Sequence, residues 1–375
     1  MQSQSTKSDR DHRFEHHRDA DAEKAHSVTP PVSHCREEQG PSWSGRPRVS
    51  LWSLILATVV ATASTLATAG TNITSALPPS EKPFDPKPLM DQLSQRISID
   101  KFRFAVLGDS KHSPLLPELL KFMDEKVKPD FVLYTGDIVE NGAEEEGVEQ
   151  YRALAKEIGT ELRQRPWWVV IGNHELGRAP QSGTDHFAEF FNLNSSRYSF
   201  TFRNAVFVAL PYPTLTPQEE AWLRDELRSA SAVHKLIFVF NHVPFYTVGA
   251  KSARSVPNRP SVVTKLFEQH GVMAVFSGHD HVYYDTVREG IPYIISAGAG
   301  AQTYELMRRA EAVPGDVYYG IDPKTRQGVL HRADGREETF SEQQVFLNVV
   351  DVDGDSVTCT CYNAAGEKWD ERQLK

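Results

Sequence analysis

From residue 101 onward, short apolar segments alternate with segments whose apolar residues recur at helical spacing. Buried β-strands are predicted for "FRFAVLG", "DFVLYTGD", "PWWVVIGN", "KLIFVFNH", "VMAVFSGH" and "PYIISAG". Helices are predicted for "PLLPELLKFMDEKV", "VEQYRALAKEIGTEL" and "TPQEEAWLRDELRSA". In the last of these, Thr216 is the expected N-cap, with Pro217 at the first helical position and Glu219 at the third. The alternation predicts an α/β domain with a largely buried sheet.

Two further patterns predict β-hairpins. "YSFTFRNAVFVAL" reads as two short strands, and "QVFLNVVDVDGDSVTCTCYNAAG" as a terminal hairpin with Asp-Gly at its tip. Cys359 and Cys361 lie two residues apart in that hairpin and share a face, so they are interpreted as ordinary strand residues and not as a disulfide. Residues 304–343, which precede the hairpin, are interpreted as a loop that shapes a pocket.

The first 100 residues differ in composition from the rest. Residues 1–50 are polar with mixed charges, which predicts a disordered leader. Residues 51–69, "LWSLILATVVATASTLATA", are uncharged and end in a small-residue cleavage pattern. This favours a signal peptide and export to the periplasm or medium, with a single-span membrane anchor as the alternative. Residues 70–100 contain several prolines and read as a linker or wrapping segment before the domain at 101–375.

The charge balance bears on the kind of partner. A net charge of −9 gives no footprint for nucleic acid, which would require clustered Lys and Arg. An acidic protein that handles phosphate needs a local source of positive charge, and bound metal ions are the obvious one. The composition therefore gives no reason to expect a nucleic-acid partner, and it does not specify an oligomeric state.

Five predicted strands end in the same kind of residue. These strand ends read Gly108-Asp109, Gly136-Asp137, Gly172-Asn173-His174-Glu175, Asn241-His242 and Gly278-His279-Asp280-His281. Open α/β sheets place their sites beyond the carboxyl ends of the strands, so these residues are expected to converge on one crevice. Carboxylate, amide and imidazole ligands together suit Zn, Mn or Fe better than Ca or Mg. A carboxylate shared by two such ions would hold them about 3.5–4 Å apart, as in two-metal hydrolysis.

The blocks "GD…GD…GNHE…NH…GHDH", in this order and each after an apolar strand, resemble the calcineurin-like metallophosphoesterase superfamily over residues 101–300. The segments "YSF", "PQEEAWLRDEL", "FNHVPFY" and "GIPYIISAGAGA" are similar to its exported, purple-acid-phosphatase-like subgroup. The resemblance implies that residues 101–375 form a metallophosphoesterase domain. Its implied fold is a four-layer α/β/β/α sandwich, with two mixed β-sheets face to face and helices outside.

The resemblance also implies a role for each matched residue. Asp137 would bridge two metal ions. The other implied ligands are Asp109 and His281 for the first ion, and Asn173, His242 and His279 for the second. His174 would stabilise the transition state or protonate the leaving group without binding metal. The implied reaction is in-line attack of a metal-bound hydroxide on the phosphorus of a phosphorylated small molecule.

Lys111 departs from the family pattern. Most members have Asp-x-His in the first block, and that His is a ligand, but a protonated lysine has no lone pair for a metal. Purple acid phosphatases place a Tyr three residues after the second Asp, where this chain has Glu140. A purple tyrosinate colour is therefore not expected, even with iron bound.

Three interpretations of this departure stay open. In the first, Lys111 points into the site and binds substrate phosphate as a fixed positive charge, which would make it catalytic together with His174. In the second, His112, Glu140 or Asn141 completes the shell of the first metal ion. In the third, the first metal site is weak or empty.

The expected function is hydrolysis of a phosphomonoester at a centre of two metal ions. A phosphodiesterase or nucleotidase of the same fold is one alternative, and a degenerate, non-catalytic protein that binds metal or phosphate is the other. Tyr246, Tyr283 and Tyr284 follow the metal-site blocks and are candidates for lining the substrate pocket.

Overall fold

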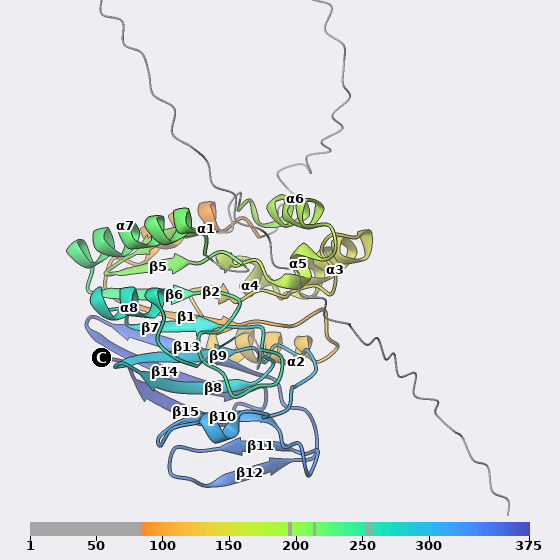
Figure 1. Ribbon diagram of the computed structural model, residues 1–375. Helices are drawn as coiled ribbons and strands as arrows, with labels where there is room; N and C mark the ends of the chain where they lie inside the picture. The colour runs from red at the N-terminus through yellow and green to blue at the C-terminus, as the bar shows by residue number, and fades with distance from the viewer. Residues whose placement is uncertain (1–83, 194–196, 213–214, 253–255, 257) are drawn as a thin grey trace, which may run out of the picture. The chain divides into compact units, whose positions relative to one another are not determined.

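The computed structural model describes residues 84–193, 197–212, 215–252, 256 and 258–375 (Figure 1). The predicted leader, the predicted export segment and the first part of the predicted linker lie outside these residues and stay predictions. Within the described residues, no helix has both the length and the apolar character needed to cross a bilayer.

The strands of the described residues form two mixed sheets. One has the order β15-β14-β13-β1-β2-β3, with β1 Lys101–Leu107, β2 Phe131–Tyr134, β3 Trp167–Val169, β13 Phe346–Asp353, β14 Ser356–Asn363 and β15 Lys368–Gln373. The other has the order β12-β11-β10-β8-β9-β7-β6-β5-β4, with β4 Tyr198–Phe202, β5 Ala205–Ala209, β6 Leu236–Phe240, β7 Ala274–Ser277, β8 Tyr283–Arg288, β9 Ile291–Ser296, β10 Val317–Ile321, β11 Gly328–His331 and β12 Glu337–Phe340. Strands β1, β2 and β3 are parallel, as are β5, β6, β7 and β9. The predicted hairpins are confirmed as β4–β5 and β13–β14.

Side-chain alternation along the strands explains how the two sheets stack. In β6, Phe238 and Phe240 face the core between the sheets, whereas Ile237 and Val239 belong to a second core on the opposite face. Aromatic rings fill the space between the sheets, and Phe104 of β1 lies 5.3 Å from the ring of Phe238 in an edge-to-face contact. Successive apolar residues along such a strand therefore lie on opposite faces, so both faces of the sheet are apolar.

Most of the described helices cover the outer faces of the sandwich, and one begins at the predicted metal ligand Asn173. They are α2 Leu116–Phe122 with its π-helical extension Met123–Val127, α3 Glu145–Glu157, α4 Thr160–Arg163, α5 Asn173–Leu176, α6 Pro180–Phe191, α7 Pro217–Val233, α8 Val262–Gln269 and a 3₁₀ turn Arg309–Glu311. Leu223 and Leu227 of α7 and Phe267 of α8 pack on the nine-stranded sheet. The capping box of Thr216 and Glu219 begins α7, as predicted. The predicted four-layer α/β/β/α sandwich is confirmed.

A helix occupies part of the segment that the prolines predicted to be a linker or wrapping segment. This helix, α1 (Pro86–Arg96), begins at Asp85, whose side chain accepts a hydrogen bond from a backbone N–H of the first turn. Pro86 occupies the first helical position, where its missing N–H costs nothing. Met90 and Leu93 are buried in the core. Residues 86–96 are therefore packed on the domain and do not act as a spacer.

The segment 304–343 is not a loop, and that prediction is wrong. Strands β10, β11 and β12 lie in it and extend the nine-stranded sheet by antiparallel pairing. The outermost strand, β12, is mostly exposed and begins with Glu337 and Glu338. Because this edge strand is polar, its sequence shows no alternation of apolar and polar residues, and the pattern could not identify it.

Three tyrosines that were candidates for lining the substrate pocket are buried in the core instead. Tyr246, Tyr283 and Tyr284 are buried. Their hydroxyl groups donate to Glu289, Asp370 and Asp316, respectively. Buried tyrosine hydroxyls usually find such partners, so these side chains are structural. Cys359 and Cys361 are buried free thiols, as predicted.

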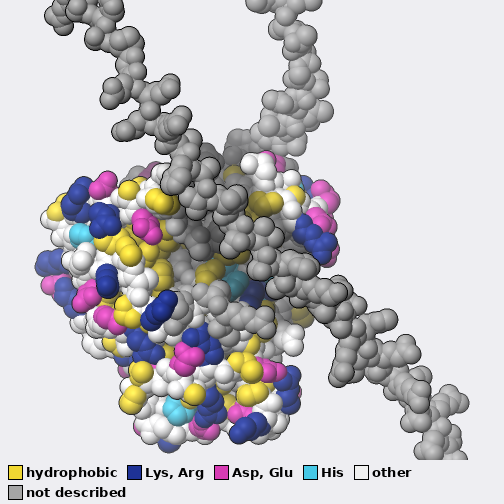
Figure 2. All heavy atoms as spheres, viewed as in Figure 1, with side chains coloured by type: hydrophobic (Ala, Val, Ile, Leu, Met, Phe, Trp, Pro, Cys, Tyr) yellow, Lys and Arg dark blue, Asp and Glu magenta, His cyan; other side chains and the backbone are white. Residues whose placement is uncertain are grey.

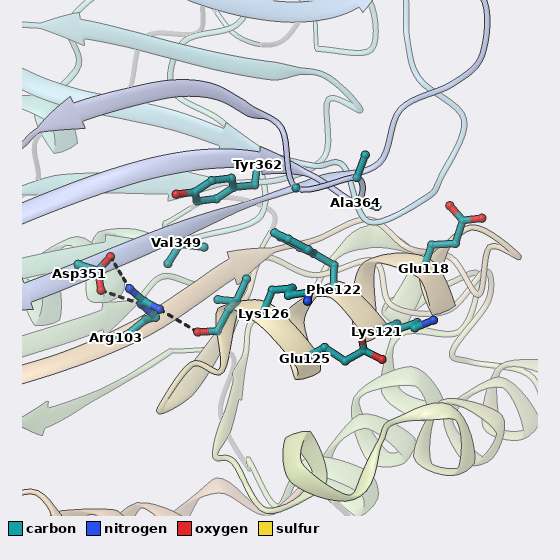
Figure 3. Close-up of a pocket in the computed structure, with 13 residues that line it drawn as sticks. Arg103, Glu118, Lys121, Phe122, Glu125, Lys126, Val349, Asp351, Tyr362 and Ala364 are labelled. Atoms are coloured by element: carbon teal, nitrogen blue, oxygen red, sulfur yellow. Dashed lines mark hydrogen bonds and ion pairs between the residues drawn. The ribbon is translucent and has the colours of Figure 1, made fainter.

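A cavity of about 740 Å³ lies on the outer face of the six-stranded sheet, between α2 and strands β13 and β14 (Figure 3). Phe122, Val349 and Tyr362 form its apolar part, and Arg103 at one side donates to the carboxylate of Asp351 at 2.7 Å. None of the predicted metal ligands lines it. This cavity is therefore separate from the strand-end crevice.

The described surface carries charges of both signs. On the face seen in Figure 2, Lys and Arg side chains lie among Asp and Glu side chains. Surface ion pairs such as Arg332–Glu338, at 2.7 Å, show how positive charges are matched locally. Such exposed pairs contribute little to stability, at most about 1 kcal/mol each.

Shortening Leu93 tests whether α1 is an integral part of the fold. Because Leu93 is 2% exposed, Leu93→Ala is expected to lower the free energy of unfolding by about 2–5 kcal/mol. Chemical denaturation followed by circular dichroism measures the change. Gln95→Ala, at an exposed position of the same helix, serves as the control and should have little effect. Equal stabilities for both variants would show that α1 is not part of the cooperative unit.

Candidate metal centre

The carboxyl ends of the parallel strands in the six-stranded sheet bring three predicted ligands together. Asp109 follows β1, Asp137 follows β2, and Asn173 follows β3. The first two loops are joined by backbone hydrogen bonds, because Asp109 N donates to Gly136 O at 2.9 Å and Lys111 N donates to Asp137 O at 3.0 Å. The ladder of the sheet thus continues into the loops and fixes the spacing of the side chains.

The nine-stranded sheet supplies the histidines. His242 follows β6, and His279 and His281 follow β7, where Gly278 N donates to His242 O at 2.9 Å. The two sheets meet at this edge, because the backbone N–H of His279 lies 3.0 Å from both carboxylate oxygens of Asp109. Five strand ends from two sheets therefore converge, as the sequence predicted.

Several of these residues adopt a backbone conformation that L-residues rarely occupy. Asp109, Asp137 and His279 have φ angles of 62°, 57° and 71°. Left-handed conformations at residues other than glycine are strained and concentrate at functional sites. The surrounding sheets hold these residues in that conformation, which turns each side chain into the crevice directly after its strand.

Glycine precedes the ligands for a steric reason. A Cβ on Gly172 would lie 2.2 Å from Asp137 Oδ1, and a Cβ on Gly278 would lie 2.4 Å from Asp109 Oδ2. Neither distance is physically possible, so only glycine permits the loops to approach the two carboxylates. The glycines of the "GNHE" and "GHDH" blocks are thus required by packing against ligands of other strands.

One group of ligand atoms surrounds His242. Its Nε2 lies 3.3 Å from Asp137 Oδ1, 3.1 Å from Asn173 Oδ1 and 3.0 Å from His279 Nδ1. The opposite nitrogen, Nδ1, lies 2.8 Å from the carbonyl oxygen of Thr135. Since a carbonyl oxygen only accepts, Nδ1 carries a proton and the Nε2 of a neutral His242 presents a lone pair to the group.

A second group forms around Asp109. Asp109, Asp137 and His281 offer ligand atoms that all lie within 4.8 Å of one another. His281 Nδ1 donates to the carbonyl oxygen of Gln302 at 2.8 Å, which leaves Nε2 facing Asp109 Oδ1 at 3.5 Å. Both His281 Nε2 and Asp137 Oδ2 are buried without a hydrogen-bond partner. Buried acceptors without a donor are costly, and a cation would satisfy them.

The protonation preferences reflect the negative charge of Asp137 at the centre. Burial disfavours the charged form of Asp137, but the charges and hydrogen bonds of His242 and His174 outweigh it and hold the pKa of Asp137 well below its usual range. Burial lowers the pKa of His242, yet Asp137 more than compensates and raises that pKa to about 9. Burial and then His242 lower the pKa of His279 to about 2. The carboxylate of Asp137 is thus charged and the imidazole of His279 neutral, whereas the second proton that Asp137 favours on His242 would have to leave before its Nε2 could bind a metal ion.

His174 lies beside both groups but belongs to neither. Its backbone N–H donates to Asp137 Oδ1 at 2.9 Å, and its Nδ1 lies 2.5 Å from the carbonyl oxygen of Glu140. Its Nε2 is 3.9 Å from Asp137 Oδ2, and the side chain is 20% exposed. A partly open imidazole with a fixed tautomer is suited to exchange a proton with a bound molecule.

Glu175 is a buried residue of the site to which the sequence analysis assigned no role. Its Oε2 accepts the backbone N–H groups of Asp137 and Gly172, and its Oε1 accepts that of Ile138, each at 2.7 Å. Burial and the charge of Asp137 raise the pKa of Glu175 to about 7. Glu175 therefore holds the loop of Asp137 against that of Asn173.

Lys251 is a second residue that the sequence analysis missed. Its Nζ lies 3.5 Å from Asn173 Oδ1 and 3.9 Å from Asp137 Oδ2. It lies 5.9 Å from the ring centre of Tyr304, and that ring stacks on His281 at 4.1 Å. Burial lowers the pKa of Lys251, and the nearby charge of Lys111 lowers it further. No local pattern around Lys251 marks it, because its loop is folded over the centre by tertiary contacts.

The residues weighed as replacements for the missing histidine lie in different places. Within the described residues, the two ligand groups include neither His112 nor Glu140. The carboxylate of Glu140 is more than half exposed and lies 3.7 Å from His174 Nδ1. Asn141 Oδ1 faces Gly177, where a Cβ would approach it to 2.1 Å. Among the residues that the structure describes, the Asp109 group therefore contains three candidate ligands, Asp109, Asp137 and His281.

Comparison with known proteins shows that the chain is similar to phosphoesterases. Residues 102–283 match the family model described as calcineurin-like phosphoesterase. The chain is 27% identical over 225 residues to the serine/threonine-protein phosphatase CPPED1 of Pongo abelii, which covers 54% of this chain and 71% of that protein. It is 26% identical over 213 residues to a probable glycerophosphodiester phosphodiesterase, GpdQ of Arcobacter nitrofigilis, which covers 54% of this chain and 75% of that protein.

Two solved structures share the fold. The purple acid phosphatase PPD1 from yellow lupin (Lupinus luteus) seeds aligns with 74% of this chain at 14% identity, with a TM-score of 0.55. This chain spans 54% of the lupin protein. GAP50 of Plasmodium, described as an anchor in the inner membrane complex, aligns with 74% of this chain and 89% of its own at 15% identity, with a TM-score of 0.51. These likenesses concern the architecture of the two sheets.

Replacing Glu175 tests its role in holding the centre. Glu175→Gln puts an amide NH₂ where backbone N–H groups now donate to the carboxylate, so the loop of Asp137 should shift. Metal affinity, measured by competition with a chromogenic chelator, is expected to fall about 10- to 100-fold. Glu146→Gln, at an exposed position of α3, is the control. Unchanged affinity in Glu175→Gln would mean that the loop positions Asp137 without this carboxylate.

Proposed function

We propose that this chain, whose residues 102–283 match the calcineurin-like phosphoesterase model, hydrolyses phosphomonoesters at a centre of two metal ions. The observation that carries the proposal is the sharing of Asp137 by the two ligand groups, one with His242 and His279 and one with Asp109 and His281. A single carboxylate common to two groups is how a protein holds two cations side by side.

Each residue of the centre has a separate task in this proposal. Asp109 and His281 would hold one ion, and Asn173, His242 and His279 the other, with Asp137 between them. Bound ions of this kind lower the pKa of water and neutralise the charge of phosphoryl oxygens. The buried side chains keep bulk water away, and the carbonyl partners of the histidines keep their lone pairs aimed inward.

His174 is proposed to protonate the leaving oxygen. Its Nδ1–H is held by the carbonyl oxygen of Glu140, so a second proton would reside on Nε2, which faces the centre. A positioned imidazolium can transfer that proton in the transition state, an effect worth about 10²- to 10⁴-fold in rate. The partial exposure of the ring leaves space for the ester group.

Lys111 is proposed to bind the substrate phosphate. It lies in the turn between Asp109 and His112, is half-buried, and has a left-handed φ of 46°. Its backbone N–H donates to Asp137 O, so the turn is tied to the centre. An ammonium on this turn would supply the fixed positive charge that an acidic protein needs in order to attract a phosphate ester.

A phosphodiesterase is the second candidate function. Its support is the likeness to a relative named as a glycerophosphodiester phosphodiesterase. Rates with p-nitrophenyl phosphate and bis(p-nitrophenyl) phosphate distinguish the two, because a monoesterase prefers the dianionic substrate. No turnover of either substrate in a metal-loaded protein would instead favour the non-catalytic alternative.

Two substitutions distinguish a residue that binds metal from a residue that takes part in catalysis without binding metal. Asp137→Asn should abolish turnover and lower the metal content, because it removes the charge that both groups share. His174→Ala should lower kcat about 100-fold or more while the metal content stays at the level of the parent protein. Metal analysis and p-nitrophenyl phosphate kinetics on the same samples give both values.

His234→Ala, a histidine at the end of α7, is the control and should change neither value. If His174→Ala strips the metal, the histidine is a ligand and the division proposed here is wrong. If Asp137→Asn keeps both metal and turnover, Asp137 does not bridge the ions.

A further inference from the structure

We infer that Lys251 binds a phosphoryl oxygen of the substrate and that Asp280 is the positioning residue that holds Lys251 over the centre. The inference rests on the proposed phosphoesterase function and deepens it by adding a second cation to the substrate site. Asp280 is the middle residue between the predicted ligands His279 and His281, and the sequence analysis gave it no role.

The ammonium group of Lys251 lies where a phosphate ester would arrive. Its two oxygen neighbours, Asn173 Oδ1 at 3.5 Å and Asp137 Oδ2 at 3.9 Å, are the atoms assigned to metal ions. A cation bound to these oxygens would compete with the ammonium for them, and Lys251 would then require another anionic partner. Its side chain is 24% exposed, so the partner can come from solvent.

Neutralising Asp137 is the competing role for Lys251, and the contacts speak against it. Lys251 Nζ lies 3.9 Å from Asp137 Oδ2, which is beyond hydrogen-bonding distance, and that oxygen has no hydrogen-bond partner, so the ammonium does not satisfy it. A lysine that served only a buried carboxylate would be buried with it, whereas Asp137 is fully buried and Lys251 is not. The ring of Tyr304 below the ammonium provides a surface that favours a cation without neutralising it.

Asp280 fixes the loop that carries Lys251. The Thr247 hydroxyl donates to Asp280 Oδ2 at 2.5 Å, and the backbone N–H of Ser252 donates to Asp280 Oδ1 at 3.0 Å. Gly249 N donates to the Thr247 hydroxyl oxygen at 2.9 Å. One buried carboxylate therefore anchors both ends of the turn 247–252, and Lys251 directly precedes the anchored Ser252.

The opposite side of the same turn is also held. Thr247 N donates to Asn258 Oδ1 at 2.8 Å, and Asn258 Nδ2 returns a hydrogen bond to Thr247 O at 2.7 Å. Arg308 N donates to Val248 O at 3.0 Å. The turn is thus clamped between Asp280 on one side and Asn258 and Arg308 on the other. Such preorganisation lets an otherwise flexible lysine side chain act at one position.

The first arm of the experiment compares Lys251→Met and Lys251→Arg with the metal-loaded parent protein. Methionine keeps most of the side-chain length without the charge, so Lys251→Met should raise the dissociation constant of inorganic phosphate about 10- to 100-fold. The KM for p-nitrophenyl phosphate should rise with it, and the metal content should not change. Lys251→Arg should restore most of the phosphate affinity. Isothermal titration calorimetry with phosphate provides a readout that does not depend on turnover.

The second arm is a double-mutant cycle. Thr247→Val removes the hydroxyl that Asp280 holds and lies outside the block of metal ligands, so it tests the anchor without touching His279 or His281. It should weaken phosphate binding several-fold in the parent protein and have no further effect in the Lys251→Met background. Asp280→Asn should behave in the same way. Asp316→Asn, which alters a buried carboxylate that accepts from Tyr284 and Val313, is the matched control and should leave phosphate binding unchanged.

Every other result would contradict a specific part of the inference or of the proposed function. Phosphate affinity that is unchanged in Lys251→Met removes Lys251 from the substrate site. If Lys251→Met loses metal, the role of Lys251 is to neutralise Asp137, and this result likewise overturns the inference. Additive effects of Thr247→Val and Lys251→Met show that the anchor does not act through Lys251. A parent protein that binds metal and phosphate without turnover refutes the proposed hydrolysis but not the phosphate-binding role, whereas a parent that binds no phosphate refutes that role.

Discussion

A buried carboxylate, that of Asp137, is the constraint on which the rest of the centre depends. Burying an unpaired charge costs several kcal/mol, so a protein that buries one must surround it with matching groups. Here the surrounding groups come from both sheets, with His242 and the backbone of His174 close to its Oδ1. Its Oδ2 is left without a hydrogen-bond partner. This oxygen is thus the atom of the centre that a bound cation would satisfy.

The architecture explains how the ligands reach one point. Parallel strands in both sheets run toward the same edge, and backbone hydrogen bonds such as Gly278 N to His242 O continue the ladder past the strand ends. The left-handed conformations of Asp109, Asp137 and His279 turn the side chains inward at once. The strain of these conformations is sustained by the extensive apolar core on both faces of the nine-stranded sheet.

Local pattern was sufficient for the residues that sit at strand ends. Each candidate ligand follows an apolar segment and a turn, so the sequence could predict that these side chains converge, and the order of the blocks indicated the fold. The roles of Glu175, Lys251 and Asp280 could not be predicted from the sequence. These roles consist of hydrogen bonds and close contacts between loops, which produce no periodic pattern along the chain. The polar edge strand β12 was missed for the related reason that it buries no apolar face. Helix α1 did carry a signal, since Asp85-Pro86 is a favourable helix start.

The central claim is that the two ligand groups sharing Asp137 bind two metal ions, although the first block of the chain has Lys111 where most of the family has a histidine. The most direct test is the metal stoichiometry of the purified full chain after loading with Mn, Zn, Fe or Co, measured by inductively coupled plasma mass spectrometry. Two ions per chain are expected for at least one of these metals. One ion or none with every metal would contradict it.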